Sequence, residues 1–173
     1  MSDSKRPNAW GYIAETLRVV GMLFLLWPFV PPVLHAVGLH SFAAALEYPW
    51  SLTCHRGPER TLDLVGYKMP MCSRCTGIDL GIGLGLVLGR PYRGPIAMWI
   101  WLIAAVAFML ADVYLLSANG VIWHPSRIFT GGFLSFPVAA AVSAIARRER
   151  DAPEATVTAA ESSSPSAARR PRA

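Results

Sequence analysis

The stretch IAMWIWLIAAVAFMLADVYLLS, residues 96–117, decides the fold class of this chain. It holds one charged residue, Asp112, and is long enough to cross a bilayer, because roughly 20 apolar residues span the hydrocarbon layer as a helix. Of the chain's 173 residues, 53% are apolar and only 16% are charged. Since roughly a quarter of the residues in a soluble domain are charged, we predict an integral membrane protein.

Three further apolar segments lie at residues 19–39, 76–89 and 128–146. The first contains three prolines, so we expect it to be kinked. It is also too long and too rich in proline for the apolar region of a usual signal peptide, and we interpret it as an uncleaved span. The sequence therefore predicts an all-α fold, a polytopic membrane helix bundle with about four transmembrane spans.

The chain divides into three parts around these segments. Residues 1–18 form a polar to amphipathic leader, and residues 19–146 form the membrane domain, with a Cys- and His-bearing outer loop at residues 51–75. Residues 147–173 are rich in Ala, Ser, Pro, Glu and Arg and lack aromatic residues, which predicts a disordered tail. Within the outer loop, residues 61–68 predict a small hairpin that bends near Gly66.

The distribution of Lys and Arg sets the orientation, because cytoplasmic loops carry an excess of both. Most of these residues flank the termini and the turn at residues 90–95. We therefore predict a multi-pass protein of the cell (inner or plasma) membrane with both termini cytoplasmic. The expected partner is the lipid bilayer. Nucleic acid is not expected, because no soluble domain presents a basic stripe.

A glycine row marks the second apolar segment. It consists of Gly77, Gly81, Gly85 and Gly89, which recur every four residues. Such a row lets a neighbouring helix approach closely, backbone to backbone. It predicts either packing within the bundle or an interface of a homo-oligomer.

All three cysteines of the chain fall in the outer loop, which points to a metal site. Cys54 is followed by His55, and Cys72 and Cys75 form a CxxC motif at the start of the second apolar segment. Three thiolates and an imidazole suit tetrahedral zinc, and a hairpin before a CxxC is typical of zinc ribbons. The sequence predicts a metal site with these four ligands, favouring zinc or another soft transition metal.

Two alternatives stay open, and with them the question whether the protein is an enzyme. A CxxC at a helix N-terminus in an oxidising compartment is also typical of a membrane thiol–disulfide oxidoreductase. The four-span arrangement resembles that of quinone-linked disulfide-generating enzymes, but those use two cysteine pairs and this chain has three cysteines. The second alternative is a non-enzymatic, structural membrane protein whose loop is stapled by a disulfide.

Five charged residues are candidates for a supporting role. Glu59 and Arg60 follow Cys54 closely, and Asp79 lies one helical turn beyond Cys75 on the same face. Asp112 and Arg127 lie at the outer ends of the third and fourth segments, which a short loop joins. Because a carboxylate in the membrane is costly, we predict that Asp112 pairs with Arg127.

Two motifs of the chain resemble a known family. Residues 54–60, CHRGPER, and 70–78, PMCSRCTGI, are similar to the CHxxPERS and CxRCTGIYxG motifs of small prokaryotic integral membrane proteins known as domain of unknown function 2085. The likeness extends to Asp112 and to RIFTG at residues 127–131. Asp79 departs from the family pattern, which has an aromatic residue there. The resemblance implies a membrane protein with a site at these motifs, and it implies no particular reaction.

Overall fold

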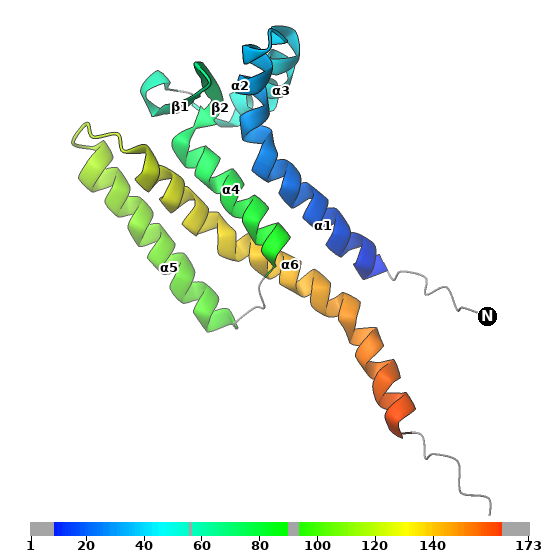
Figure 1. Cartoon of the computed structure of the whole chain (residues 1–173). Coiled ribbons are helices and arrows are strands. Elements are labelled where there is room, and N and C mark those ends of the chain that lie inside the picture. The colour runs from blue at the N-terminus through cyan, green and yellow to red at the C-terminus, as the bar shows by residue number, and fades with distance from the viewer. Residues whose placement is uncertain (1–8, 56, 90–93, 164–173) are drawn as a thin grey trace, which may run out of the picture.

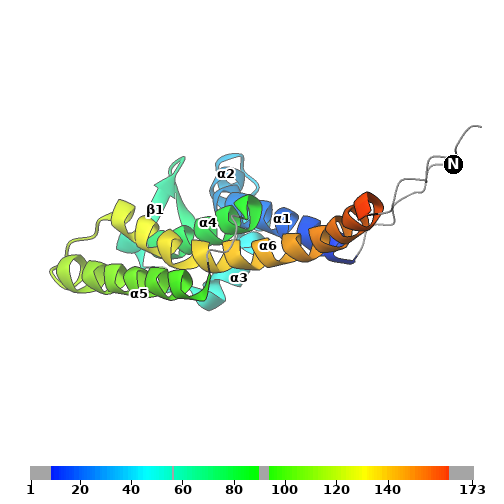
Figure 2. The ribbon, with the colours of Figure 1, turned by 90° about the horizontal axis from the view of Figure 1, so that it is seen from below.

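The computed structural model describes residues 9–55, 57–89 and 94–163, which are mostly helical and confirm the predicted all-α membrane bundle. Four long helices run side by side along the molecule (Figure 1). They are α1 (Ala9–Leu26), α4 (Ser73–Leu88), α5 (Pro95–Ala111) and α6 (His124–Ser163). Seen from below, α5 flanks one side of α6, while α4 and α1 lie on the other (Figure 2).

Short elements cap one end of the bundle (Figure 1). They are η1 (Trp27–Phe29), α2 (Val30–Ala36), α3 (His40–Thr53), η2 (Pro58–Arg60), β1 (Thr61–Leu64) and β2 (Tyr67–Cys72). The kink predicted for the first apolar segment is confirmed, because the 3-10 turn η1 interrupts the helix at Pro28. Proline lacks an amide N–H and clashes with the preceding turn, so it breaks the α-helical pattern there.

The predicted hairpin is also confirmed. Strands β1 and β2 pair antiparallel, and Val65 and Gly66 form the bend with φ angles of 55° and 82°. Two successive positive φ values are typical of the two-residue type I′ turn, whose twist matches that of the flanking strands. Strand β2 runs directly into α4, so the hairpin is fixed to the bundle at Cys72.

The glycine row of α4 packs against α6 of the same chain. A Cβ atom added to Gly77 would lie 2.2 Å from the carbonyl oxygen of Ile128, and one added to Gly85 would lie 2.6 Å from that of Phe136. Ser135 of α6 donates a hydrogen bond of 2.8 Å to the carbonyl oxygen of Ile78. The row is therefore used within the bundle, the first of the two roles that the sequence predicted for it.

The opposite face of α4 packs against α1. A Cβ atom on Gly83 would lie 2.6 Å from Cγ of Leu25, and one on Gly21 would lie 2.8 Å from Cβ of Leu86. Glycines on two faces thus let α4 fit between two long helices. This explains why α4 is the most enclosed helix although it is short.

The predicted number of spans was wrong. Three helical segments of the described chain are long and apolar enough to cross a membrane: 9–36, 96–115 and 124–151. Helix α4 has 16 residues, which at 1.5 Å each is about 24 Å, shorter than a hydrocarbon layer of about 30 Å. The second apolar segment therefore forms a helix shorter than a full span, which lies between α1 and α6 and returns the chain to the end of the bundle opposite the hairpin (Figure 1).

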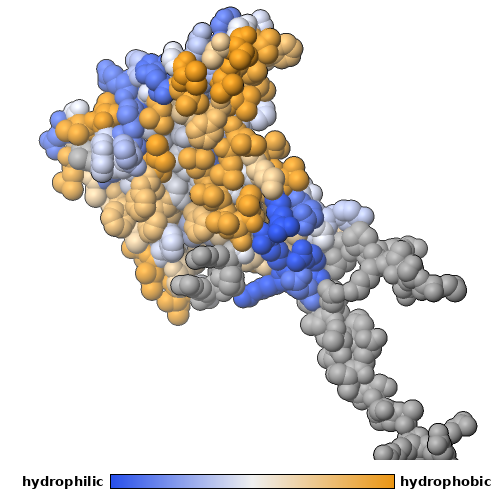
Figure 3. All heavy atoms as spheres, viewed as in Figure 1, coloured by the Kyte–Doolittle hydropathy of each residue, from blue (hydrophilic) through white to orange (hydrophobic). Residues whose placement is uncertain are grey.

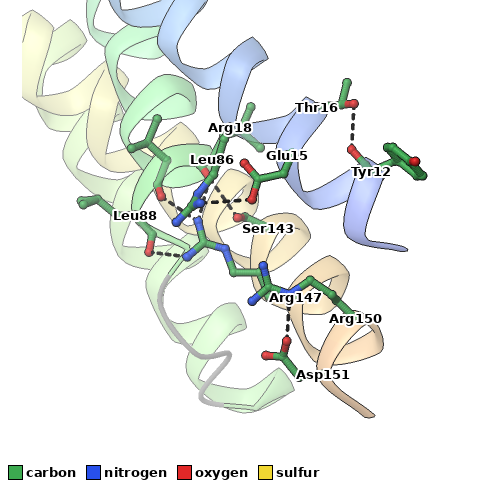
Figure 4. Close-up of polar contacts among 11 residues, drawn as sticks. Tyr12, Glu15, Thr16, Arg18, Leu86, Leu88, Ser143, Arg147, Arg150 and Asp151 are labelled. Atoms are coloured by element: carbon green, nitrogen blue, oxygen red, sulfur yellow. Dashed lines mark hydrogen bonds and ion pairs between the residues drawn. The ribbon is translucent and has the colours of Figure 1, made fainter. Parts of the chain in front are cut away.

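Arginine from α6 caps the lower end of α4 (Figure 4). Nη2 of Arg147 donates to the carbonyl oxygen of Val87 at 2.7 Å, and its Nη1 lies 3.4 Å from that of Leu88. Ser143 donates to the carbonyl oxygen of Leu86 at 2.9 Å. The last carbonyl groups of a helix have no intrahelical donor, so these side chains supply the missing hydrogen bonds.

Two predicted segment boundaries differ from the structure. Helix α1 begins at Ala9, so the second half of the predicted leader 1–18 is helical, and residues 1–8 lie outside the described chain. Helix α6 continues to Ser163, although the sequence led us to expect disorder from residue 147 onward. Residues 147–163 are rich in Ala, Glu and Arg, which favour helix and extend α6 beyond its apolar part.

Apolar side chains cover most of the face that Figure 3 displays. Hydrophilic residues gather where α1 begins and α6 leaves the bundle, and the close-up of this end includes Arg18, Arg147 and Arg150 (Figures 3 and 4). Exposed large apolar side chains, such as Trp99, Ile100 and Ile103, are numerous on α5. This distribution is typical of a protein whose flanks face lipid.

The first prediction concerns the α4–α6 contact. Replacing Gly77 with Ala puts a methyl group against the backbone of Ile128, which cannot move aside without displacing α6. We expect a loss of about 1–3 kcal/mol in the free energy of unfolding, measured by denaturation in detergent. Gly57→Ala is the control, since Gly57 has a φ of −63° and its added Cβ would lie 3.7 Å from Arg60. Equal stabilities of the two variants would contradict the packing role.

Candidate metal centre

The three cysteines converge at the junction of the hairpin and α4. Cys54 follows the last residue of α3 in an extended conformation, Cys72 ends β2, and Cys75 lies in the first turn of α4. Their sulfur atoms all lie within 4.8 Å of one another. The backbone N–H of Cys72 donates to Sγ of Cys54 at 3.3 Å. Residues from three elements thus form one compact thiol cluster.

The cysteine cluster is buried on one side and partly exposed on the other. Cys54 is buried, while Cys72 and Cys75 are partly exposed, and all three are free thiols. Met71 and Ser73, the neighbours of Cys72, are fully buried. Solvent is therefore excluded from the buried side of the cluster, whereas the two cysteines of the CxxC motif can be reached from outside.

The surroundings shift the pKa values of Cys72 and Cys54 in opposite directions. A hydrogen bond from the side chain of Cys75 lowers the pKa of Cys72 to about 5, against the effect of burial. Burial raises the pKa of Cys54 above its usual value. Cys72 is therefore a thiolate at neutral pH, and a thiolate is the form that binds metals and attacks disulfides.

The donor set fits a soft metal ion. In tetrahedral zinc sites the Zn–S bond is about 2.3 Å, which puts the sulfurs about 3.8 Å apart. The three sulfurs are within 4.8 Å of one another, so a contraction of at most about 1 Å brings them to this geometry. Thiolates select zinc, copper(I) or iron–sulfur centres over magnesium or calcium.

The other residues predicted from the outer loop lie at its surface. His55 follows Cys54 in the chain, but its side chain is exposed, and the ligand atoms gathered within 4.8 Å are those of the cysteines. Glu59 and Arg60 are exposed on η2. The structure thus brings together three of the four predicted ligands, and the role of His55 stays a prediction.

Asp112 lies in a buried polar network at the same end of the molecule. It begins the π-helical segment η3 (Asp112–Ser117), and its side chain is only 4% exposed. One carboxylate oxygen pairs with Arg74 of α4, and the other accepts a hydrogen bond of 2.5 Å from Ser126 of α6. The carboxylate therefore joins three helical elements close to the CxxC motif.

Arg127 is buried beside this network, with 5% of its surface exposed. The charges of Asp112, Arg74, Arg60 and Cys72 all act on its guanidinium group. Asp112 forms an ion pair with Arg74. Arg127 thus lies near both the carboxylate and the thiol cluster, and its direct pairing with Asp112 stays a prediction.

Asp79 is buried in α4, one turn beyond Cys75. Its Oδ2 atom has no hydrogen-bond partner among the described residues. The structure therefore places this carboxyl group near the cysteine cluster along α4 and shows no contact that assigns it to the site.

Sequence reasoning missed the part that Arg74 and Ser126 play. The guanidinium group of Arg74, a residue of the CxxC motif, pairs with Asp112. Helical geometry carried this signal, because Arg74 lies between Cys72 and Cys75 in sequence and so points away from the face they share. The short loop between the third and fourth segments brought residue 127 to Asp112, and Ser126 beside it was not considered although a serine can donate a hydrogen bond to a carboxylate.

Residues 54–141 match the family of predicted membrane proteins called domain of unknown function 2085. The match covers both cysteine motifs, η3 and most of the apolar part of α6. The chain belongs to this family.

Two archaeal proteins share parts of this sequence. An uncharacterized protein of Methanocaldococcus jannaschii is 30% identical over 77 residues, which are 44% of this chain and 42% of that protein. An uncharacterized protein of Methanothermobacter thermautotrophicus is 64% identical over 28 residues, 16% of this chain and 25% of that protein. The chain thus spans less than half the length of either relative. No solved structure matches the chain.

The second prediction tests the buried ion pair. The effects of Asp112→Asn and Arg74→Gln on the free energy of unfolding should not add up in the double variant, because each single variant leaves one charge of the pair without its partner. Arg74 is 25% exposed and Asp112 is 4% exposed. We expect a coupling of about 0.5–3 kcal/mol. The control pair is Glu15 and Arg18, which are 61% and 46% exposed and should show a coupling below about 0.5 kcal/mol. Additive losses at Asp112 and Arg74 would refute the pair.

The third prediction tests the thiolate. In metal-free protein at pH 7, iodoacetamide should modify Cys72 faster than Cys54, since the first is ionised and the second is a buried thiol. The rate at Cys72 should fall as the pH drops through about 5. Mass spectrometry of quenched samples gives both rates, and unfolded protein serves as the control. A Cys72 rate that still rises between pH 8 and 9 would contradict the lowered pKa.

Proposed function

We propose that this protein binds one zinc ion at the extracytoplasmic surface of the cell membrane, with Cys54, Cys72 and Cys75 as ligands. The observation that carries the proposal is the convergence of all three cysteines of the chain, with every sulfur within 4.8 Å of the others. Three thiols brought together from separate elements supply three soft ligands to one metal ion. The thiolate character of Cys72 further supports metal binding.

The distribution of arginine supports the proposed orientation. Arg18, Arg147 and Arg150 lie at the end of the bundle opposite the hairpin (Figures 1 and 4). Cytoplasmic ends of membrane proteins are enriched in Lys and Arg, so the cysteine cluster belongs to the extracytoplasmic end. The termini then face the cytoplasm.

The fourth ligand decides what the metal does. His55 is adjacent to Cys54 and exposed, so a rotation of its side chain into the cluster would complete a Cys3His site. Zinc with four protein ligands is structural and would fix the hairpin to α3 and α4. Zinc with three cysteines and a water would act as a Lewis acid on a ligand at the membrane surface.

The fourth prediction tests the metal site. Protein purified without chelator should contain about one zinc ion per chain by elemental analysis, and Cys54→Ser, Cys72→Ser and Cys75→Ser should each abolish most of this content. Asp63→Asn, which removes an exposed carboxylate from the hairpin, should leave the zinc content unchanged. His55→Ala should weaken zinc binding at least about tenfold if His55 is the fourth ligand.

A wild-type protein with less than about 0.2 equivalents of any transition metal, and with three intact thiols, would refute metal binding. Thiol–disulfide exchange is the second candidate function, and the lowered pKa of Cys72 in the CxxC motif favours it. In that case alkylation of intact membranes would trap a Cys72–Cys75 disulfide that reductant opens. A permanent disulfide that resists mild reductant would indicate a structural staple.

A further inference from the structure

His35, at the end of α2, lies in a polar cluster separate from the cysteines. Its Nε2 is 3.2 Å from Oε1 of Glu47, and its Nδ1 is 3.0 Å from Nδ1 of His40. The two imidazole centroids are 5.3 Å apart. This equals the distance between the Nδ1 atoms plus the radius of each ring, so the two centroids and the two nitrogens lie nearly on one line. The two Nδ1 atoms therefore point at each other, as they do in a hydrogen bond.

The donors and acceptors of this chain can be assigned. The carboxylate of Glu47 only accepts hydrogen bonds, so Nε2 of His35 carries a proton. In a neutral His35 the other nitrogen, Nδ1, then has a free lone pair and accepts. Nδ1 of His40 must be the donor. The order is His40 to His35 to Glu47, with each proton pointing toward the carboxylate.

This order limits how many protons the cluster can hold. One extra proton can bind to Nε2 of His40, which is exposed, and both hydrogen bonds remain. A second extra proton must bind to Nδ1 of His35. Two N–H groups and two positive charges would then face each other over 3.0 Å, and the contact between the rings would break.

The surroundings connect this cluster to the hairpin and to a cavity. The ring of Tyr67 stacks on His35 with a centroid distance of 5.4 Å and an angle of 14°. A cavity of about 450 Å³ is lined by His35, Glu47, Tyr67 and Lys68, among others. Lys68 forms an ion pair of 3.2 Å with Asp63. His35, Glu47, Tyr67 and Lys68 thus bring charged and titratable groups from α2, α3 and β2 to this cavity.

We propose that Glu47, His35 and His40 form a proton-binding site, which takes up one proton with its hydrogen bonds intact and loses the His35–His40 contact with the second. The inference does not depend on metal binding by the cysteines. The second step separates the two rings, because two N–H groups cannot share the 3.0 Å contact between the Nδ1 atoms. Its consequence is local, because the contact bridges the turn between α2 and α3, where Gly38 has a φ of 84°.

The fifth prediction tests the direction of the hydrogen bonds. In protein labelled with ¹⁵N-histidine and held in nanodiscs at pH 7.5, long-range ¹H–¹⁵N spectra should show His35 with its proton on Nε2 and His40 with its proton on Nδ1. Glu47→Gln should allow His35 to carry its proton on either ring nitrogen, because an amide can donate a hydrogen bond as well as accept one. A proton on Nδ1 of His35 in the wild type would overturn the proposal.

Hydrogen exchange tests the consequence in the same sample. Between pH 7 and pH 5, the protection factors of amides in the turn and the first residues of α3 should fall several-fold in the wild type. His40→Phe should show low protection at both pH values, and His124→Gln, at a histidine in the first turn of α6 and outside the cluster, should behave as the wild type. Protection that is unchanged by pH in the wild type, or equal in wild type and His40→Phe, would refute the proton-dependent contact.

Discussion

The close contact of α4 with α6 is the constraint on which the rest of the structure depends. Gly77 and Gly131 let the two backbones touch, and a Cβ atom on Gly131 would lie 2.3 Å from the carbonyl oxygen of Arg74. The upper end of α4 carries the CxxC motif, and the upper end of α6 carries Ser126 and Arg127. If α4 stood one side-chain layer farther from α6, Arg74 of α4 and Ser126 of α6 could not both reach Asp112.

Two polar centres share the hairpin at the upper end of the molecule. Cys72 ends β2 and belongs to the thiol cluster, while Tyr67 begins the same strand and stacks on His35. A displacement of β2 would therefore move both Cys72 in the thiol cluster and Tyr67 beside His35. Zinc would hold the end of the strand at Cys72, whereas the protonation state of His35 and His40 acts on the elements packed at Tyr67.

The sequence predicted what depends on composition and local geometry. The apolar runs, the prolines of the first segment and the bend at Gly66 each act through a few neighbouring residues, and the structure confirms them. The gathering of the three cysteines followed from their spacing around the hairpin. The contact of Arg74 with Asp112 did not follow from the sequence, because these residues are 38 positions apart and the packing of α4 brings them together. The number of spans was also overestimated, since apolarity alone does not separate a lipid-facing helix from one enclosed by its neighbours.

The capping of α4 by Arg147 bears on how the protein is assembled in the membrane. The donors that satisfy Val87 and Leu88 come from a residue about 60 positions later in the chain. During synthesis, α4 therefore waits with open carbonyl groups until α6 has emerged and turned back along it. The end of α4 is thus completed by a helix that is made later, and truncation of α6 before Arg147 would leave the carbonyl groups of Val87 and Leu88 without these donors.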